Sequence, residues 1–241
     1  MISELVIDAQ DIKKSYGSGE TRFDALKGVS LQVRRGESVA IVGKSGSGKT
    51  TLMHILALLD APDSGSLSVT GQNAATLKTK QVNKLRNKEF GFVFQQFFLT
   101  PNATVLDNVV LPLKIAGITG SERKRRGLEV LERLEMGSKA SNKATALSGG
   151  QKQRTVISRA LVNNPSVIFA DEPTGNLDSA TGTTVEEILF GLVREEGITL
   201  ILVTHDEDLA ARCDRQIHVK DGLITHVTGA ENTTTTEGDV K

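Results

Sequence analysis

A chain of 241 residues can bury a substantial core, so we expect one large domain or two closely packed subdomains. Its 29 Lys and Arg residues are balanced by 29 Asp and Glu residues, which argues against a long basic track for nucleic acid. The apolar runs are all shorter than the roughly 18 to 20 residues that cross a bilayer, so any membrane role is expected to need a partner.

The N-terminal part of the chain is expected to form strands, because polar, glycine-containing turns separate runs of alternating or apolar residues. From Lys49 the apolar spacing becomes helical, and Pro62 and Gly65 end that helix. A single cysteine, Cys213, and the lack of a secretion signal favour a reducing, non-secreted setting. The expected elements are strands at 4–12, 24–33 and 37–43, a helix at 49–59, a strand with a turn at 64–72, a polar helix at 80–88 and a strand at 90–95.

Residues from about 97 to 165 are expected to be almost entirely helical and to form an inserted helical subdomain. Continuous apolar strands then alternate with helices, which indicates a parallel sheet buried on both faces. We therefore expect an α/β fold with a parallel-sheet core and an N-terminal antiparallel β region, in one domain over residues 1–228. Residues 229–241 are Thr-rich and almost devoid of apolar side chains, so disorder is expected there. The later elements are expected as strands at 166–173, 198–206, 215–222 and 223–227, with a helix at 179–196.

The stretch "GKSGSGKTT" follows an apolar strand and opens a helix, which is the context in which the pattern G-x-x-x-x-G-K-[ST] binds phosphate. Its glycines allow successive backbone N–H groups to point at an anion. Lys49 is expected to reach the β and γ phosphates, and Thr50 to offer its hydroxyl to Mg²⁺. A dinucleotide-binding turn is a poorer alternative, because the glycine spacing is not G-x-G-x-x-G. The expected nucleotide-binding residues here are Gly43, Lys44, Ser45, Gly46, Ser47, Gly48, Lys49, Thr50 and Thr51.

Two adjacent carboxylates, Asp171 and Glu172, stand at the end of an apolar strand, where ligands collect in open α/β folds. Neighbouring residues of a strand point to opposite faces, so two different roles are expected. Asp171 is expected to hold Mg²⁺ through its water shell, and Glu172 to orient and deprotonate the attacking water. The alternative, that both acids are merely solvated, is weaker beside a phosphate-binding loop.

Three further side chains could belong to the same site. His205 and Gln95 each follow an apolar strand, where either could act on a ligand or simply satisfy local backbone groups. Tyr16 is the only tyrosine in a chain without tryptophan and lies at a polar glycine turn. Its ring could stack on adenine or make a surface packing contact.

The stretch "LSGGQKQR", residues 147–154, adds a second glycine turn that opens a helix. Ser148 and Gln151 have the spacing of a capping box, which accounts for these two residues. It does not account for Gly149 and Gly150, since a glycine in a helix costs about 1 kcal/mol relative to alanine. Bare glycines at a helix N-terminus would let a phosphate approach the backbone closely. We therefore expect Ser148 to Gln151 to face the γ-phosphate held by another copy of the chain in a two-fold dimer.

Four features follow one another along the chain: the phosphate-binding loop, "LSGGQ", "DEPTGNLD" and His205. In this order they resemble the nucleotide-binding subunit of an ATP-binding cassette (ABC) transporter, and the resemblance runs from about residue 4 to 227. The resemblance implies ATP-driven dimer closure, hydrolysis, and transmission of that motion to membrane subunits through a groove beside Gln95. "GNLD" replaces the commoner S-A-L-D. Together with "GFVFQQFFLTPNATVLDNVVLPL" and "ALKGVSL", it is similar to the lipoprotein-release, macrolide-export and related bacterial efflux ATPases, whose action is described as mechanotransmission.

The resemblance also assigns roles by position. Glu172, His205, Gln95 and Lys49 would be catalytic, and Thr50, Gln95 and Asp171 would serve the metal. It places adenine stacking at Tyr16, the Walker A loop at Gly43 to Thr51, the Q-loop at Gln95, the signature at Leu147, Ser148, Gly149, Gly150 and Gln151, the Walker B pair at Asp171 and Glu172, the D-loop at Asp178 and the switch histidine at His205.

The expected protein is an ATPase that uses ATP and Mg²⁺, pairs with a second copy of itself and drives an integral membrane permease. It would sit in the cytoplasm, on the inner face of the cell membrane, without direct nucleic-acid binding. Two alternatives stay open: a soluble ABC ATPase acting on nucleic acid or ribosomes, and an ATP-gated regulator of a transmembrane enzyme. The neutral charge and the single cassette argue against the first alternative.

Overall fold

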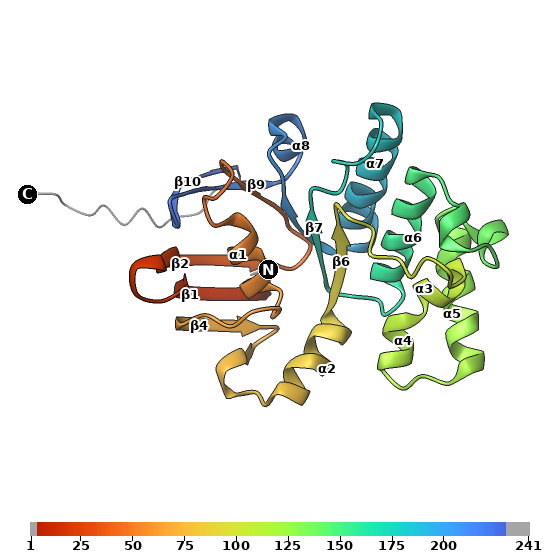
Figure 1. Cartoon of the computed structure of the whole chain (residues 1–241), viewed down its shortest axis with the longest axis horizontal. Coiled ribbons are helices and arrows are strands. Elements are labelled where there is room, and N and C mark those ends of the chain that lie inside the picture. The colour runs from red at the N-terminus through yellow and green to blue at the C-terminus, as the bar shows by residue number, and fades with distance from the viewer. Residues whose placement is uncertain (1–3, 230–241) are drawn as a thin grey trace, which may run out of the picture.

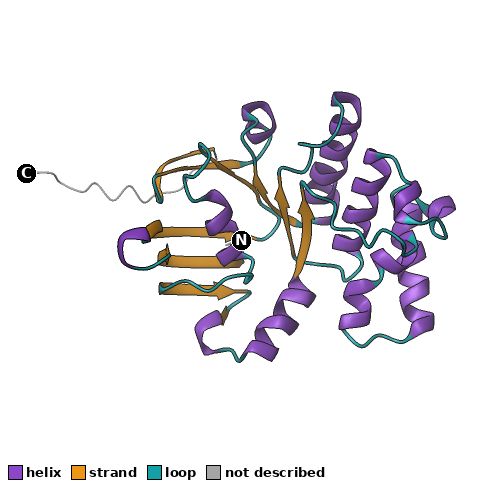
Figure 2. Cartoon of the chain, in the orientation of Figure 1, coloured by secondary structure: helices purple, strands orange, loops and turns teal. Residues whose placement is uncertain are grey.

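The computed structural model describes residues 4–229. Figure 1 shows an antiparallel sheet at the left, a second sheet through the middle and a group of helices at the right. Figure 2 shows the same division between strand-rich and helix-rich halves.

The strands are β1 (Leu5–Tyr16), β2 (Phe23–Arg34), β3 (Ser38–Val42), β4 (Ser64–Val69), β5 (Gln72–Asn73), β6 (Phe90–Phe94), β7 (Val167–Asp171), β8 (Thr199–Val203), β9 (Arg215–Lys220) and β10 (Leu223–Gly229). The α-helices are α1 (Lys49–Leu56), α2 (Thr79–Glu89), α3 (Val105–Val109), α4 (Leu111–Ile115), α5 (Gly120–Arg133), α6 (Gly149–Leu161), α7 (Ser179–Glu196) and α8 (Glu207–Ala211).

The strands form two sheets, as the sequence predicts. The first is antiparallel, with the order β2-β1-β4-β5. The second has the order β10-β9-β3-β8-β7-β6, in which all neighbours are parallel except β10 against β9. Parallel neighbours need crossover connections, and here helices supply them. The chain is therefore an α/β protein with an added antiparallel β region.

The central sheet is buried on both faces. In β3, Val39 and Ile41 contribute to a core shared with α1 and the antiparallel sheet, whereas Ala40 and Val42 contribute to a core shared with the helices on the other face. The same alternation continues in β7 and β8. Each buried Val or Ile side chain contributes about 1.5–3 kcal/mol, so the sheet is held rigidly from two sides. That rigidity fixes the positions of the residues that follow its strands.

The helical region is less continuous than the sequence analysis predicts. Its helices α3 to α6 lie between Val105 and Leu161, but residues 97–104 carry no helix. Between α5 and α6 the backbone forms only two short 3-10 turns, Gly137–Lys139 and Ala144–Ala146. Thr104 caps α3 by accepting a hydrogen bond from the Asp107 backbone N–H, so α3 begins only after a loop that leads from β6. The region consists of short capped helices joined by ordered loops.

The C-terminal boundary of the domain also differs from the expectation. From the sequence, the domain is expected to end at residue 228 and a tail to begin at 229, whereas Thr228 and Gly229 are the last residues of β10 and pair with Gln216 and Arg215. Backbone pairing in an antiparallel ladder needs no apolar side chain, which is why composition misplaces this boundary. Residues 230–241, where disorder is expected, lie outside the described part of the chain. Across residues 4–229, none of the helices is both long and apolar enough to cross a membrane.

Candidate functional site

The carboxyl ends of the central strands gather most of the expected site residues along one edge. Strands β6, β7 and β8 end at the same level, because Asp171 pairs with Phe94 on one side and with Val203 on the other. Strand β3 runs parallel beside β8 and leads directly into the glycine-rich loop. The residues that leave this edge are Gly43 after β3, Gln95 after β6, Glu172 after β7 and His205 just after β8.

The glycine-rich loop has a backbone that presents N–H groups at the start of α1. Gly43, Gly46 and Gly48 all have positive φ angles, of 154°, 77° and 106°. A Cβ at Gly43 would lie 2.1 Å from the Val219 carbonyl oxygen, and one at Gly48 would lie 2.6 Å from the Ala25 carbonyl oxygen. Both positions therefore exclude any larger residue. Gly48 is the N-cap of α1 and brings no side-chain cap, so the first N–H groups of this helix remain available for an anion.

The side chains of the loop fit a polyphosphate. Lys49 folds back over the loop, and its Nζ donates hydrogen bonds to the carbonyl oxygens of Gly43 (2.8 Å) and Lys44 (2.9 Å). Ser47 is buried, and its Oγ has no hydrogen-bond partner among the described residues. Thr50 is exposed in the first turn of α1. A flexible ammonium, a buried free hydroxyl and unpaired N–H groups are the donors that phosphate oxygens require.

The two carboxylates at the end of β7, Asp171 and Glu172, have different surroundings. The pKa of Asp171 is raised by burial and by the neighbouring charge of Glu172. No residue in the described part of the chain donates a hydrogen bond to the Asp171 carboxylate, and among those residues Asp171 belongs to no group of three or more His, Cys, Asp or Glu side chains that could hold a metal ion. A buried carboxylate without donors favours a bound cation. Asp171 and the Thr50 hydroxyl are both oxygen donors of the kind that Mg²⁺ prefers.

Glu172 is held in an unusual backbone conformation and is oriented from β8. Its φ angle is 45°, which is uncommon for a residue with a side chain and is found most often at functional sites. Its carboxylate lies 2.7 Å from Nδ1 of His205, accepts a hydrogen bond from the His205 backbone N–H at 3.0 Å, and accepts one from the Thr204 hydroxyl at 3.3 Å. These contacts fix Glu172 at the sheet edge.

His205 is largely exposed, with a side chain that is 79% accessible, and its only side-chain partner among the described residues is Glu172. The hydrogen bond and the charge of Glu172 raise the pKa of His205. The outer edge of the imidazole ring therefore faces open space with one nitrogen available. The alternative of a histidine that only caps local backbone groups is not what this geometry favours.

Gln95 and Tyr16 lie at the ends of strands that belong to different sheets. Gln95 is exposed at the end of β6, one strand away from Glu172. Tyr16 ends β1 with its side chain partly exposed, and its hydroxyl donates to Asp60 at 2.9 Å and also meets the side chain of Thr51. Burial and the Asp60 contact raise the pKa of the Tyr16 hydroxyl. The ring is thereby anchored beside α1, where an adenine could stack on it.

The second glycine turn is in a different part of the molecule. Ser148 is the N-cap of α6 and forms the expected capping box, with the Gln151 N–H donating to Ser148 Oγ and the Ser148 N–H to Gln151 Oε1. Ser148, Gly150 and Gln151 line a cavity of about 420 Å³. No residue of the phosphate-binding loop lines this cavity. In Figure 1, α6 lies to the right of β6 and β7, whereas α1 lies to their left. The structure does not bring Ser148 to Gln151 together with the P-loop of the same chain.

One of the two signature glycines has a packing reason that the sequence does not reveal. A Cβ at Gly150 would lie 2.5 Å from Cγ2 of Thr181 in α7, so Gly150 is required by helix packing. A Cβ at Gly149 would meet only Leu177, at an ordinary 3.4 Å. Gly149 is therefore the glycine that packing leaves free to let a phosphate approach the backbone.

The structure also identifies residues that the sequence analysis missed. Thr204 orients Glu172, and the fully buried Gln153 of α6 donates to the Pro173 carbonyl oxygen at 2.6 Å. Asn176 donates to the Gln95 carbonyl oxygen at 2.8 Å. Only Thr204 had a sequence signal, because it directly precedes His205 at a strand end.

Asp178, which the sequence singled out, caps α7 through Thr181, and the hydrogen bonds from Thr181 lower the pKa of Asp178.

A glycine-rich loop between a parallel strand and a helix, with an acidic pair ending a nearby strand, defines a P-loop nucleotide-binding protein. The particular family is decided by comparison with known proteins. The family model of ABC transporters matches residues 26–175. The chain belongs to the ABC transporter family, and it is an ATP-binding and ATP-hydrolysing cassette of that family.

Relatives confirm the resemblance to the lipoprotein-release and macrolide-export subgroup. The chain is 46% identical to the ABC transporter ATP-binding protein YbbA of Escherichia coli K12, over 93% of this chain and 98% of YbbA. It is 45% identical to the lipoprotein-releasing system ATP-binding protein LolD of Bacteroides fragilis, over 91% of this chain and 100% of LolD. It is 47% identical to the macrolide export ATP-binding/permease protein MacB of Syntrophobacter fumaroxidans, but there it spans only 32% of the relative.

Solved structures confirm the fold. The ATP-binding cassette MJ0796, in a dimeric post-hydrolysis state bound to ADP and phosphate, superimposes with a TM-score of 0.85. The two sequences are 40% identical, and the match covers 94% of this chain and 100% of MJ0796.

The glycines of the P-loop allow a matched test of the loop geometry. Gly48→Ala adds a clash with the Ala25 carbonyl to the cost of a left-handed backbone, so we expect it to lower the free energy of unfolding by about 3 kcal/mol. Gly46 also has a positive φ, of 77°, but nothing lies within 4 Å of an added Cβ, so Gly46→Ala should lower the free energy of unfolding by only about 1 kcal/mol. Urea denaturation without nucleotide measures both values. Equal losses in the two variants would contradict the close approach of Ala25 to the loop.

Proposed function

We propose that this chain works as a homodimer that sandwiches two ATP molecules and drives an export or mechanotransmission complex in a membrane. The observation that carries the proposal is the separation of Ser148 from the P-loop within one chain. A site that needs both parts requires two copies arranged head to tail, and two-fold symmetry then makes both sites alike. The dimeric state of MJ0796 supports this arrangement.

In the proposed site, the N–H groups of the P-loop and Lys49 hold the phosphates of ATP, and Tyr16 stacks on the adenine. Residues Gly43 to Thr51 line the phosphates, and Ser148 to Gln151 of the partner copy close the site together with the D-loop around Asp178. Thr50, Asp171 and Gln95 would hold Mg²⁺, whose positive charge offsets the charge that builds up on the phosphate oxygens.

Glu172 is the proposed general base. Its carboxylate takes a proton from the attacking water as the oxygen of that water bonds to the γ-phosphorus and the bond to the β-phosphate oxygen breaks. The left-handed backbone and the hydrogen bonds from Thr204 and His205 orient the carboxylate before the reaction. His205 turns its free ring edge towards the γ-phosphate. Lys49 stabilises the negative charge that develops on the departing β-phosphate oxygen.

Glu172→Gln tests the assignment of the base. The amide keeps the shape of the side chain but cannot accept a proton, so we expect ATP binding to persist while kcat falls about 10²- to 10⁴-fold. Nucleotide binding by equilibrium dialysis and phosphate release measure the two effects. Glu129→Gln, an exposed change on α5, is the matched control and should leave both unchanged. Hydrolysis by Glu172→Gln at more than half the original rate would refute the role.

Ser148→Arg tests the composite site. Because Ser148 lies outside the chain's own P-loop, the variant should bind ATP as a monomer with unchanged affinity, but should not form the ATP-dependent dimer. Ser121→Arg makes the same change at an exposed position of α5 and should dimerise normally. Size-exclusion chromatography of each variant in a Glu172→Gln background, with and without ATP, distinguishes them. A normal dimer of Ser148→Arg would rule out the head-to-tail arrangement.

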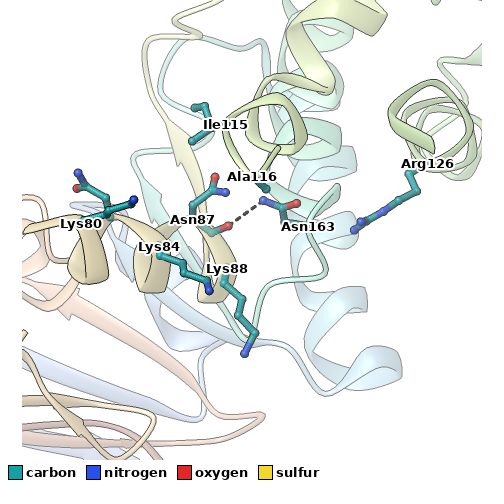
Figure 3. A pocket seen from close by; sticks show the side chains of 9 residues that line it. Lys80, Lys84, Asn87, Lys88, Ile115, Ala116, Arg126 and Asn163 are labelled. Atoms are coloured by element: carbon teal, nitrogen blue, oxygen red, sulfur yellow. Dashed lines mark hydrogen bonds between the residues drawn. The ribbon is translucent and has the colours of Figure 1, made fainter. Parts of the chain in front are cut away.

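The groove shown in Figure 3 is the proposed contact with the membrane subunit. It has a volume of about 500 Å³ and lies between α2, the end of α4, and α5. The lysines of α2 recur every four residues and so share one face, and Ile115 of α4 is 69% exposed beside them. A second, smaller groove shares Asn87 and Asn163 with the first and is lined by the first residues of β6, Phe90 to Phe92. The lining residues of the first groove carry no acidic side chain: Lys80, Asn83, Lys84, Asn87, Lys88, Ile115, Ala116, Arg126 and Asn163.

This charge predicts a permease segment with acidic residues around an apolar side chain, held at the inner face of the membrane. Lys84→Glu should therefore reduce the amount of integral membrane protein that co-purifies with tagged Glu172→Gln chain from detergent-solubilised host membranes in ATP and Mg²⁺. Lys220→Glu, an exposed change at the end of β9, is the charge-matched control and should retain it. Recovery of nucleic acid without any membrane protein would favour the alternative of a soluble ABC ATPase.

A further inference from the structure

The segment between Glu172 and Asp178, which carries "PTGN", is tied at several points to its neighbours. At its start, the buried Gln153 of α6 donates to the Pro173 carbonyl oxygen. Within the segment, the Gly175 N–H donates to the Glu172 carbonyl oxygen at 3.1 Å, and the Leu177 N–H donates to the Thr174 carbonyl oxygen at 3.0 Å. The segment therefore forms a compact turn that begins at the proposed base and ends at the cap of α7.

Two residues of this turn contact Gln95 from different directions. The side-chain amide of Asn176 donates to the Gln95 backbone carbonyl at 2.8 Å. The Cα of Gly175 faces the Gln95 side chain so closely that an added Cβ would lie 2.8 Å from Nε2 and 3.3 Å from Cδ. Asn176 thus fixes the backbone of Gln95, and Gly175 leaves just enough room for the side-chain amide of Gln95.

These contacts matter because little else holds Gln95. Its side chain is exposed, it lies past the last paired residue of the edge strand β6, and no helix follows until Val105. Asn and Gly also occupy the two positions where the sequence departs from the commoner S-A-L-D pattern. Serine at position 175 would add the Cβ that Gly175 lacks, and alanine at position 176 would remove the side-chain donor of Asn176.

We infer that Gly175 and Asn176 are positioning residues that set the place of Gln95 relative to Glu172. Asn176 holds the start of the loop after β6 against the turn after β7, and Gly175 directs the Gln95 side chain across that turn. A displacement of the Gln95 loop is then passed directly to the segment that begins at Glu172. This inference rests on the proposed role of Gln95 in hydrolysis, and it adds two residues to which no role has been given above.

A double-mutant cycle tests the role of Gly175. Gly175→Ala displaces the flexible end of Gln95, so we expect kcat to fall about tenfold with an unchanged KM for ATP and an unchanged melting temperature. In a Gln95→Ala background the clash disappears, and Gly175→Ala should then cause no further loss. An equal loss in both backgrounds would overturn the inference, because Gly175 would then act independently of Gln95.

The hydrogen bond of Asn176 has its own test, with a readout that does not depend on activity. The chain contains no tryptophan, so Phe98→Trp, at a position that is 65% exposed just after Gln95, gives a single fluorescent reporter. In that background, Asn176→Asp keeps the shape but removes the donor. We expect lower fluorescence anisotropy and about twofold faster iodide quenching than in the reporter alone, consistent with the loss of one net hydrogen bond. Unchanged anisotropy and quenching would refute the role of Asn176.

The two sets of measurements separate this inference from the proposed function. If Gln95→Ala alone keeps full kcat, the proposed role of Gln95 fails, while the fluorescence reporter still decides whether Asn176 holds the loop. If Gln95→Ala lowers kcat but the cycle is additive, the proposed role of Gln95 stands and the positioning role of Gly175 fails.

Discussion

The parallel register of the central sheet is the constraint on which the site depends. Because Asp171 pairs with both Phe94 and Val203, three strands end at one level, and the residues that follow them meet at one edge. The strands are buried on both faces, so they cannot shift without exposing one of two apolar cores. The proposed catalytic residues Glu172, His205 and Gln95 thereby share a rigid support, which catalysis requires of groups that must be oriented before the reaction.

In the proposed dimer, the helical region supplies the part of the site that this edge lacks. Ser148 caps α6, and close packing of Gly150 against Thr181 fixes the start of α6 on α7. Helix α7 is capped by Asp178, which lies at the end of the turn that starts at Glu172. The signature and the catalytic turn of one chain are therefore mechanically connected, although they serve different nucleotides in the proposed dimer.

Much of this could be read from the sequence because the relevant physics is local. The P-loop was predictable from glycine spacing between a strand and a helix, and the capping box from the interval between Ser148 and Gln151. The places of Asp171, Glu172 and His205 followed from apolar runs that end in polar residues. Contacts between distant segments were not predictable: the Asn176 bond to Gln95 spans 81 positions, and the Gly150 contact with Thr181 joins two helices.

By itself, the sequence determined the class of the protein: a parallel α/β cassette with one phosphate-binding loop, an acidic strand end and a signature helix. It did so because backbone periodicity, glycine freedom and helix capping act over a few neighbouring residues. Only the tertiary structure decided that Ser148 lies away from its own P-loop, that Glu172 adopts a left-handed backbone, and that β10 continues to Gly229. Those outcomes depend on packing and pairing between segments far apart in the chain, which no local pattern encodes.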